Sequence, residues 1–329
     1  MTTYGWWAVL DSKEVGTKPL GAKRFGREMV FWRNPKGEVI AQSDLCPHRG
    51  ARLSSGSVVD GCIQCPFHGF LFAEDGACTK VPAHPERRIP RSLKTKTWAV
   101  REAHGFVWMW VDETCEPASD LRFFEDLDET WSVGGFEKTW NTHFTRCVEN
   151  QLDYTHIAFV HEKTIGRFAG ELVDFEVASN LDEATEGAAP EPAWIRFGES
   201  AGPDAGIEWR EPNIWINRIT PTMQITVAFV PVDDTTTKLY LRNWQKQVTL
   251  PGLAWLWQQL SGWLNRKILE EDRAVVEDQL PRIARLESDE RLVPSDRPIL
   301  LYRKLLARRR SGPTRDPSVG DADADRPAA

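Results

Sequence analysis

The 329-residue chain has neither an excess of basic residues nor a long apolar run. Its 41 Lys and Arg residues against 48 Asp and Glu residues give a formal net charge of -7, so it lacks the basic surface that holds a phosphate backbone or an anionic membrane. No apolar run reaches the roughly 18 residues of a membrane-spanning helix, and the N-terminus lacks the basic and apolar regions of a secretory signal. We therefore expect a cytoplasmic protein that binds neither nucleic acid nor a membrane.

Cysteine is scarce, and a nucleotide-binding glycine motif is missing. Six cysteines in 329 residues are too few for a disulfide scaffold and favour metal binding in a reducing compartment. No Gly-x-Gly-x-x-Gly motif links a strand to a helix, so the chain is not expected to bind a nicotinamide cofactor itself. Tryptophan, in contrast, occurs 15 times. Its rings can stack on bases or sugars, but without basic clusters they are expected to pack in the core.

The pattern of apolar residues predicts an α+β protein in three parts. Strands are expected at residues 28–34, 37–43, 105–112, 214–220, 222–232 and 237–248. Helices are expected at 147–159 and 254–280, packed against an antiparallel sheet. We assign residues 1–115 to a small all-β domain, 116–307 to a second domain and 308–329 to a disordered tail. The Trp-rich helix at 254–280 has a polar face of mixed charge, which favours packing on the core over lying on a membrane surface.

Two short motifs that combine a thiol with an imidazole lie in the stretch CPHRGARLSSGSVVDGCIQCPFHG. The four expected ligands are Cys46, His48, Cys65 and His68. A structural zinc site is one interpretation, although such sites usually pair Cys with Cys and His with His along the chain. Because each motif supplies one Cys and one His, a two-iron cluster is favoured, with both thiolates on one iron and both imidazoles on the other. Cys62 forms a Cys-x-x-Cys with Cys65 but has no matching second pair, so we interpret it as a buried apolar residue.

A second cluster of metal-binding residue types lies at residues 149–161, which read ENQLDYTHIAFVH. Asn150, Asp153 and His156 recur at three-residue steps and would share one face of a helix. His161 follows five residues later, so the helix is expected to end or bend there and let both imidazoles converge on one ion. The other interpretation makes both histidines ordinary packing residues. A carboxylate and an amide beside two histidines favour the metal site.

A site built on two histidines needs a carboxylate from elsewhere in the chain. The acidic stretch KILEEDRAVVEDQL carries Asp272 on its apolar stripe, whereas Glu271 and Asp278 project away from the stripe and are expected to be solvated. A carboxylate that faces the core must be paired, protonated or bound to metal. A salt bridge to Arg266 or Lys267 is the alternative, and Asp272 is our third metal ligand.

These motifs resemble those of the Rieske non-heme iron oxygenase α subunits, the aromatic ring-hydroxylating oxygenase family. The residues at 46–68 match its Cys-x-His and Cys-x-x-His pattern, and NQLDYTHIAFVH at 150–161 matches its Asn-x-x-Asp-x-x-His-x4-His motif at every fixed position. EEDRAVVED at 270–278 is similar to the ligand-bearing helix of short, α-subunit-only members such as dicamba O-demethylase, and VPSDRPILLYRK at 293–304 to the end of saxitoxin-pathway hydroxylases. The resemblance implies a Rieske domain followed by an antiparallel-sheet, helix-grip catalytic domain.

The resemblance also implies cofactors and residue roles. The implied ligands of a Rieske [2Fe-2S] cluster are Cys46, His48, Cys65 and His68. The implied ligands of a mononuclear Fe(II) are His156, His161 and Asp272. Asp153 would connect the two metal sites, and Asn150 would either support them by hydrogen bonding or only complete a helical turn.

The implied activity is that of a terminal oxygenase. O2 would be activated at the Fe(II) with electrons that originate in NAD(P)H and arrive through a separate reductase, a ferredoxin or both. A monooxygenase or dioxygenase reaction would hydroxylate or oxidatively demethylate an aromatic, heterocyclic or polycyclic small molecule. The family also implies a homotrimer, in which electrons pass from one subunit's cluster to the next subunit's iron. The alternative is a Rieske-type electron-transfer protein without oxygenase activity, which would not need the second histidine pair.

Overall fold

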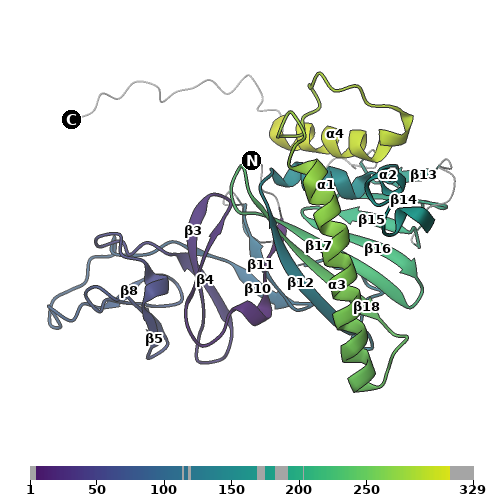
Figure 1. Cartoon of the computed structure of the whole chain (residues 1–329). Coiled ribbons are helices and arrows are strands. Elements are labelled where there is room, and N and C mark those ends of the chain that lie inside the picture. The colour runs from purple at the N-terminus through teal and green to yellow at the C-terminus, as the bar shows by residue number, and fades with distance from the viewer. Residues whose placement is uncertain are drawn as a thin grey trace, which may run out of the picture.

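The computed structural model describes residues 5–112, 115–117, 120–168, 175–181, 192–202 and 204–311. The N-terminal part contains three small β-sheets, and the C-terminal part contains one large antiparallel sheet with helices around it (Figure 1). This arrangement confirms the predicted α+β fold. Among the helices of the described ranges, none combines the length and the apolar character that a membrane span requires.

The N-terminal sheets are all antiparallel. The first joins β1 (Trp6–Asp11), β11 (Phe106–Trp110) and β10 (Val100–Ala103). The second joins β2 (Leu20–Arg24), β3 (Arg27–Arg33), β4 (Val39–Ser43) and β9 (Thr97–Trp98). The third joins β5 (Ser57–Val59), β6 (Cys62–Gln64), β7 (Leu71–Phe72) and β8 (Cys78–Lys80). One cysteine-histidine motif lies between β4 and β5, and the other lies between β6 and β7.

The C-terminal sheet has seven strands in the order β12-β18-β17-β16-β15-β14-β13. Its strands are β12 (Ser132–Trp140), β13 (Glu176–Ser179), β14 (Trp194–Gly198), β15 (Ile207–Arg210), β16 (Ile214–Thr220), β17 (Met223–Pro231) and β18 (Thr237–Gln245). The helices are α1 (Phe144–Leu152), α2 (Ile157–Val160), α3 (Pro251–Val276) and α4 (Arg297–Ser311). Short 3-10 helices span Ser12–Glu14, Leu53–Ser55, Gly166–Phe168 and Pro294–Asp296. Figure 1 shows α3 lying along one face of this sheet, with α1, α2 and α4 gathered at one end.

Two helical segments differ from their predictions. The helix expected at 147–159 is broken, because α1 ends at Leu152 and Asp153 adopts an extended backbone with φ of -96° and ψ of 123°. The chain becomes helical again only in α2, which begins at Ile157. At the C-terminus, α4 continues to Ser311 and so extends into the segment predicted to be disordered. The rest of that segment lies outside the described residues.

Most of the tryptophans pack in the core, as predicted. The buried ones are Trp6, Trp7, Trp32, Trp98, Trp108, Trp110, Trp131, Trp140, Trp209, Trp215 and Trp244. Helix α3 departs from this pattern on one side of its N-terminal half, where Trp255 and Trp263 are 64% and 65% exposed. Gln258 in the same half donates to the carbonyl of Ser132 in β12 at 3.1 Å. The helix packs on the sheet as predicted, since Ala254 and Gly262 of its first half and Leu269 and Val276 of its second are buried.

Buried contacts join the N-terminal and C-terminal parts. The Asn213 side chain donates through Nδ2 to the carbonyl of Ala8 at 2.9 Å and accepts at Oδ1 from the Ala8 N–H at 3.2 Å. Arg242 of β18 donates to Asp11 at 3.1 Å, and its guanidinium lies 3.6 Å from the centre of the Phe106 ring. Because buried polar groups are costly unless they are paired, these contacts hold the N-terminal β domain against the C-terminal sheet.

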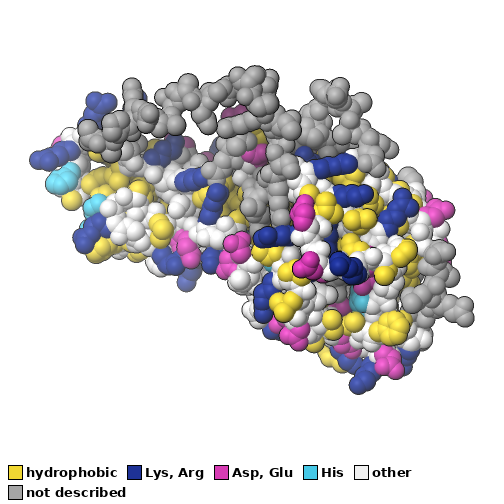
Figure 2. Space-filling model, turned by 90° about the horizontal axis from the view of Figure 1, so that it is seen from above, with side chains coloured by type: hydrophobic (Ala, Val, Ile, Leu, Met, Phe, Trp, Pro, Cys, Tyr) yellow, Lys and Arg dark blue, Asp and Glu magenta, His cyan; other side chains and the backbone are white. Residues whose placement is uncertain are grey.

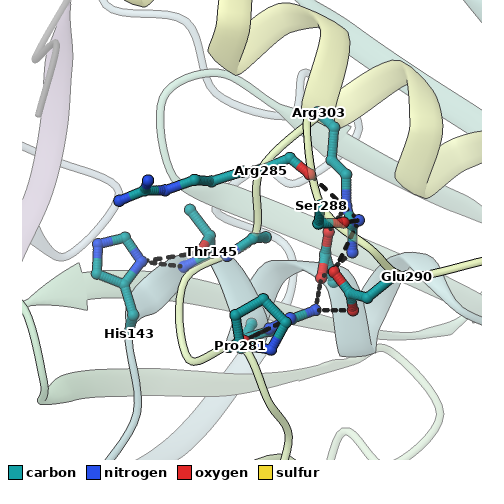
Figure 3. Close-up of polar contacts among 10 residues, drawn as sticks. His143, Thr145, Pro281, Arg285, Ser288, Glu290 and Arg303 are labelled. Carbon is teal, nitrogen blue, oxygen red and sulfur yellow. Dashed lines mark hydrogen bonds and ion pairs between the residues drawn. The ribbon is translucent and has the colours of Figure 1, made fainter.

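A network of ion pairs connects α1 and α4 (Figure 3). It consists of two arginines and two glutamates, so its charges balance. Arg303 of α4 donates to both carboxylate oxygens of Glu149, at 2.5 and 3.2 Å, and lies 3.0 Å from Glu290. Arg146 of α1 lies 2.7 Å from Glu149 and 2.9 Å from Glu290. Buried charges are stable only when they are paired in this way. The network therefore fixes α1, the element that directly precedes Asp153.

Replacing Arg303 with Met should destabilise the fold by about 3 kcal/mol, because Glu149 then keeps a buried charge with one of its two cationic partners missing. The urea midpoint of unfolding, followed by tryptophan fluorescence, measures this loss. Lys23→Met is the control, since it removes an exposed partner of Asp233 and should leave the midpoint nearly unchanged. Equal shifts in the two variants would contradict a stabilising role for the network.

Candidate metal centres and the adjoining cavity

Two loops with the same hydrogen bonds carry the first pair of motifs. In loops 46–51 and 65–70 the cysteine N–H donates to the carbonyl five residues later, and the cysteine carbonyl accepts from the glycine N–H four residues later, at distances between 2.8 and 3.0 Å. Gly50 and Gly69 have φ values of 73° and 69°, which glycine adopts without steric cost. The two loops therefore present their side chains in the same way to one shared group.

The side chains of these loops form an inner and an outer pair. Cys46 and Cys65 are buried, whereas His48 and His68 are exposed with ring centres 4.8 Å apart. Burial and the adjacent Cys65 thiol raise the pKa of Cys46 to about 11, so this thiol loses its proton at neutral pH only when a metal binds. Two thiolates on one iron and two imidazoles on the other are the ligands of a Rieske [2Fe-2S] cluster. The four residues fit that cofactor.

The surface around the outer pair is partly apolar. Leu45 and Phe67 are 48% and 56% exposed. Figure 2 shows histidine and hydrophobic side chains together at the end of the molecule that the N-terminal domain forms. A redox partner could therefore approach the imidazoles directly. Cys62, interpreted as a buried apolar residue, is half-buried, and its sulfur lies 3.7 Å from Thr79 Oγ1.

The break between α1 and α2 brings the second set of ligand types together. His156 precedes α2 and His161 follows it, so the imidazoles lie at the two ends of a four-residue helix. Asp272 reaches them from α3, and its Oδ1 lies 3.3 Å from Nε2 of His156 and 3.0 Å from Nε2 of His161. The predicted helix face shared by Asn150, Asp153 and His156 is wrong. The imidazoles converge because the chain leaves the helix at Asp153.

The Asp272 carboxylate has the surroundings of a metal ligand. Its side chain is 3% exposed, and its Oδ1 has no hydrogen-bond partner among the described residues, since the imidazole contacts lack hydrogen-bond geometry. Burial raises the pKa of Asp272, but the two histidines hold it below its ordinary value. Arg266, the alternative salt-bridge partner, lies over the ring of Phe136 at 4.5 Å. Two imidazoles and a carboxylate are the donors of a facial triad for Fe(II), and these residues fit that ion.

Glu271 has a place in the site that the apolar pattern did not indicate. Its Oε2 lies 2.9 Å from Nδ1 of His161 and accepts a hydrogen bond from Thr164 Oγ1 at 2.7 Å. The prediction that Glu271 is solvated is wrong, because α2 packs beside α3 and covers this side of the helix. A carboxylate on the outer nitrogen orients an imidazole ligand and raises its basicity. Two features of the sequence could have indicated this role of Glu271: it directly precedes Asp272, and a hydroxyl residue, Thr164, lies three residues after His161.

Asp153 lies beside the other imidazole. Its Oδ2 is 3.6 Å from Nδ1 of His156, and its Oδ1 accepts hydrogen bonds from the N–H and the hydroxyl of Thr155, both at 2.7 Å. Burial raises the pKa of Asp153, but His156 and Thr155 hold it below its ordinary value. Asn150 lines the space beside the triad, and its Nδ2 is buried without a partner in the described part of the chain. The roles of Asp153 and Asn150 stay predictions.

A cavity of about 500 Å³ adjoins the triad. It lies between α3 and the face of the sheet formed by β15 to β18, and residues of α1 and α2 also line it. Its walls are mostly apolar, as in most small-molecule sites, and its volume is in their usual range. A larger open cleft of about 1050 Å³ near Arg242 contains none of the triad residues.

Comparisons with known proteins agree with this geometry. Residues 5–99 match the family of Rieske [2Fe-2S] domains, and residues 140–311 match the vanillate O-demethylase oxygenase C-terminal domain. The chain belongs to the Rieske oxygenases. This finding confirms the predicted family and the two predicted cofactors, a [2Fe-2S] cluster and a mononuclear iron.

Individual Rieske oxygenases match parts of the chain. The vanillate O-demethylase oxygenase subunit of Pseudomonas sp. strain HR199 is 36% identical over 165 residues, which cover 49% of this chain and 46% of the relative. Aminopyrrolnitrin oxygenase PrnD of Pseudomonas fluorescens is 33% identical over 178 residues, which cover 51% and 48%. The chain thus spans about half the length of these curated relatives.

Solved structures of Rieske oxygenases match nearly the whole chain. NdmA of Pseudomonas putida CBB5 is 25% identical with a TM-score of 0.71, covering 92% of this chain and 89% of that one. Dicamba monooxygenase bound to dicamba is 21% identical with a TM-score of 0.73, covering 93% and 97%. The second likeness supports the fold alone.

Replacing Glu271 with Ala should weaken Fe(II) binding about 10- to 100-fold, because His161 loses the carboxylate that orients its ring. Anaerobic titration of the chelator-treated protein with Fe(II) measures the affinity, and the visible absorption of the Rieske cluster should not change. Glu270→Ala is the matched control, since this neighbouring acid pairs with Lys138 at 2.6 Å instead. If both variants bind Fe(II) equally well, Glu271 does not support the metal site.

Proposed function

We propose that this protein is the terminal component of an oxygenase system, and that it hydroxylates or oxidatively demethylates a small organic molecule. The observation that carries the proposal is that one chain holds both a Rieske donor set and a two-histidine, one-carboxylate set beside an apolar cavity of about 500 Å³. An electron-transfer protein would use the first donor set alone. Relatives named as an O-demethylase and an oxygenase support the same reaction class.

The proposed ligands of the Rieske cluster are Cys46, His48, Cys65 and His68, and those of the mononuclear iron are His156, His161 and Asp272. The bound iron supplies a place to activate O2 with electrons that the cluster delivers one at a time. Glu271 lies 2.9 Å from the outer nitrogen of His161, where it would hold that ring with Nε2 turned toward the metal. Asp153 lies 3.6 Å from the outer nitrogen of His156, where it would connect that ring to the cluster. The apolar walls exclude water from the reacting groups.

We further propose a homotrimer in which electrons cross between subunits. Figure 1 places the sheet of β5 and β8, with its cluster loops, at one end of the chain and α1 and α2 at the other. A direct route between the two metal sites within one chain is therefore unfavourable. The exposed His48 and His68 of one subunit would instead face Asp153 of the next, whose side chain is 26% exposed. Electrons would enter from NAD(P)H through a separate reductase, a ferredoxin or both.

The oxygenase proposal is tested with fully metallated protein, NAD(P)H, a ferredoxin and its reductase, and ¹⁸O2. Methoxylated aromatics and N-methylated heterocycles form the substrate panel. We expect O2 uptake that depends on one compound class, with ¹⁸O in a hydroxylated product or with formaldehyde released on demethylation. A protein that contains all its iron and accepts electrons, yet consumes no O2 with any compound, would instead be an electron carrier.

Asp153→Ala should leave both metals bound but abolish O2 uptake coupled to substrate, because His156 loses the group that joins it to the cluster. The iron content should stay at about three atoms per chain, two in the cluster and one at the mononuclear site. Stopped-flow absorption then follows reoxidation of the reduced cluster in a single turnover, which should be lost. Asp278→Ala, which changes an exposed acid, is the control and should behave as wild type. Wild-type turnover in Asp153→Ala would rule out the bridging role.

A further inference from the structure

The floor of the cavity is a row of side chains that crosses four strands. In the antiparallel register, Ile207 of β15 lies opposite Asn217, Asn217 opposite Ile225, and Ile225 opposite Asn243 of β18. Residues opposite each other point to the same face of a sheet, and all four line the cavity. Adjacent strands are about 4.8 Å apart, so within this row two amides flank Ile225 about 10 Å from one another.

Asn243 has a hydrogen-bond donor that the fold leaves unused. The side chain is 6% exposed, and its Oδ1 accepts a hydrogen bond from Asn265 Nδ2 of α3 at 2.6 Å. This bond fixes the orientation of the Asn243 amide. Its Nδ2 is buried and has no partner among the described residues. A buried donor without an acceptor is unfavourable, so a ligand that brings an acceptor to Asn243 would satisfy it.

The cavity has no positive side chain to receive an anion. Among its described lining residues there is no Lys or Arg, and the charged ones are Asp153 and Asp272 beside the two histidines. The internal segments outside the described residues, 113–114, 118–119, 169–174, 182–191 and 203, contain neither Lys nor Arg in the sequence. Arg242, which precedes Asn243 in β18, is paired with Asp11 at 3.1 Å.

The charge of the metal site itself adds to this exclusion. A ferrous ion brings two positive charges, whereas Asp153, Asp272 and Glu271 together bring three negative ones. A carboxylate or sulfonate in the cavity would therefore be buried without compensating charge, which is strongly unfavourable. A neutral molecule meets no such penalty.

We propose, on the basis of the oxygenase function above, that the cavity selects neutral, largely apolar substrates with a hydrogen-bond acceptor for Asn243 and rejects aromatic acids. The acceptor is a carbonyl, ether or ring nitrogen that accepts a hydrogen bond from Asn243 Nδ2. Trp215, Leu241 and Leu264 provide the apolar contact. Asn243 is thus the residue that determines specificity, while Asn265 positions it.

Three ligands of nearly equal shape test the proposal on the reduced, anaerobic holoenzyme. 2-Acetylnaphthalene is neutral and has an acceptor, 2-ethylnaphthalene is neutral and has none, and 2-naphthoate is an anion. Isothermal titration measures affinity, and the EPR spectrum of the ferrous-nitrosyl form reports whether each ligand lies beside the iron. We expect the acetyl compound to bind about 10-fold more tightly than the ethyl compound, and the naphthoate at least about 100-fold more weakly than the acetyl compound.

Asn243→Leu should lower the affinity for the acetyl compound to that for the ethyl compound and leave the latter unchanged. Asn243→Asp is the second variant, because it keeps the shape and the acceptor for Asn265 but has no donor. It should weaken binding of the acetyl compound at least as much. Retained visible absorption of the Rieske cluster and unchanged circular dichroism show that each variant is folded.

Equal or tighter binding of naphthoate, or an unchanged preference for the acetyl compound in both variants, would overturn the proposal, as would the absence of binding by all three ligands. These measurements involve no turnover, so they are independent of the oxygenase assay. If the predicted order of affinities appears but no compound supports O2 uptake, the cavity assignment holds and the oxygenase function fails. If a compound supports O2 uptake but the predicted order of affinities does not appear, the oxygenase function holds and the proposed substrate class is wrong.

Discussion

The site depends on the burial of one carboxylate. Asp272 faces the interior from α3, and a buried carboxylate is stable only with partners that offset its charge. Those partners are His156 and His161, which reach it because α1 ends at Leu152 and the chain runs extended through Asp153. One requirement thus ties the second half of α3, the end of α1 and the short α2 into a single arrangement.

The same packing places the cavity next to the metal ligands. The helix that carries Asp272 is also the roof of the cavity, and the sheet on which this helix packs is the floor. The buried network of Arg303 and Glu149 connects α1 to α4, so the segment that precedes the histidine pair is held by charge as well as by apolar contact. The space between roof and floor therefore opens directly beside the triad.

The metal-binding motifs could be predicted because their information is local. Cys46 and His48 lie within one loop, and Cys65 and His68 within another, so spacing alone indicates a shared group. The α+β fold followed from alternation in the strands. Asp272 required one further step, since it was recognised by its place on an apolar stripe.

Features that depend on distant neighbours could not be predicted. The three-residue steps from Asn150 to His156 fit a continuous helix, and only tertiary packing ends that helix at Asp153. Glu271 is covered by α2, which no pattern within α3 reveals. The exposure of Trp255 and Trp263 depends on how much of α3 the rest of the protein covers. A helical repeat shows only that one face is apolar, so it does not predict this exposure.

Side chains of β18 point alternately to the cavity and to the N-terminal domain. Asn243 faces the cavity, whereas its neighbour Arg242 contacts Asp11 and Phe106 in the N-terminal domain. Successive residues of a strand point to opposite sides, so mutations at alternate positions act on different properties. Substitutions at Asn243 and Asn217 would alter the wall of the cavity while leaving the contacts between the domains in place. The chemistry of the cavity wall can thus vary during evolution independently of the contacts that hold the two domains together.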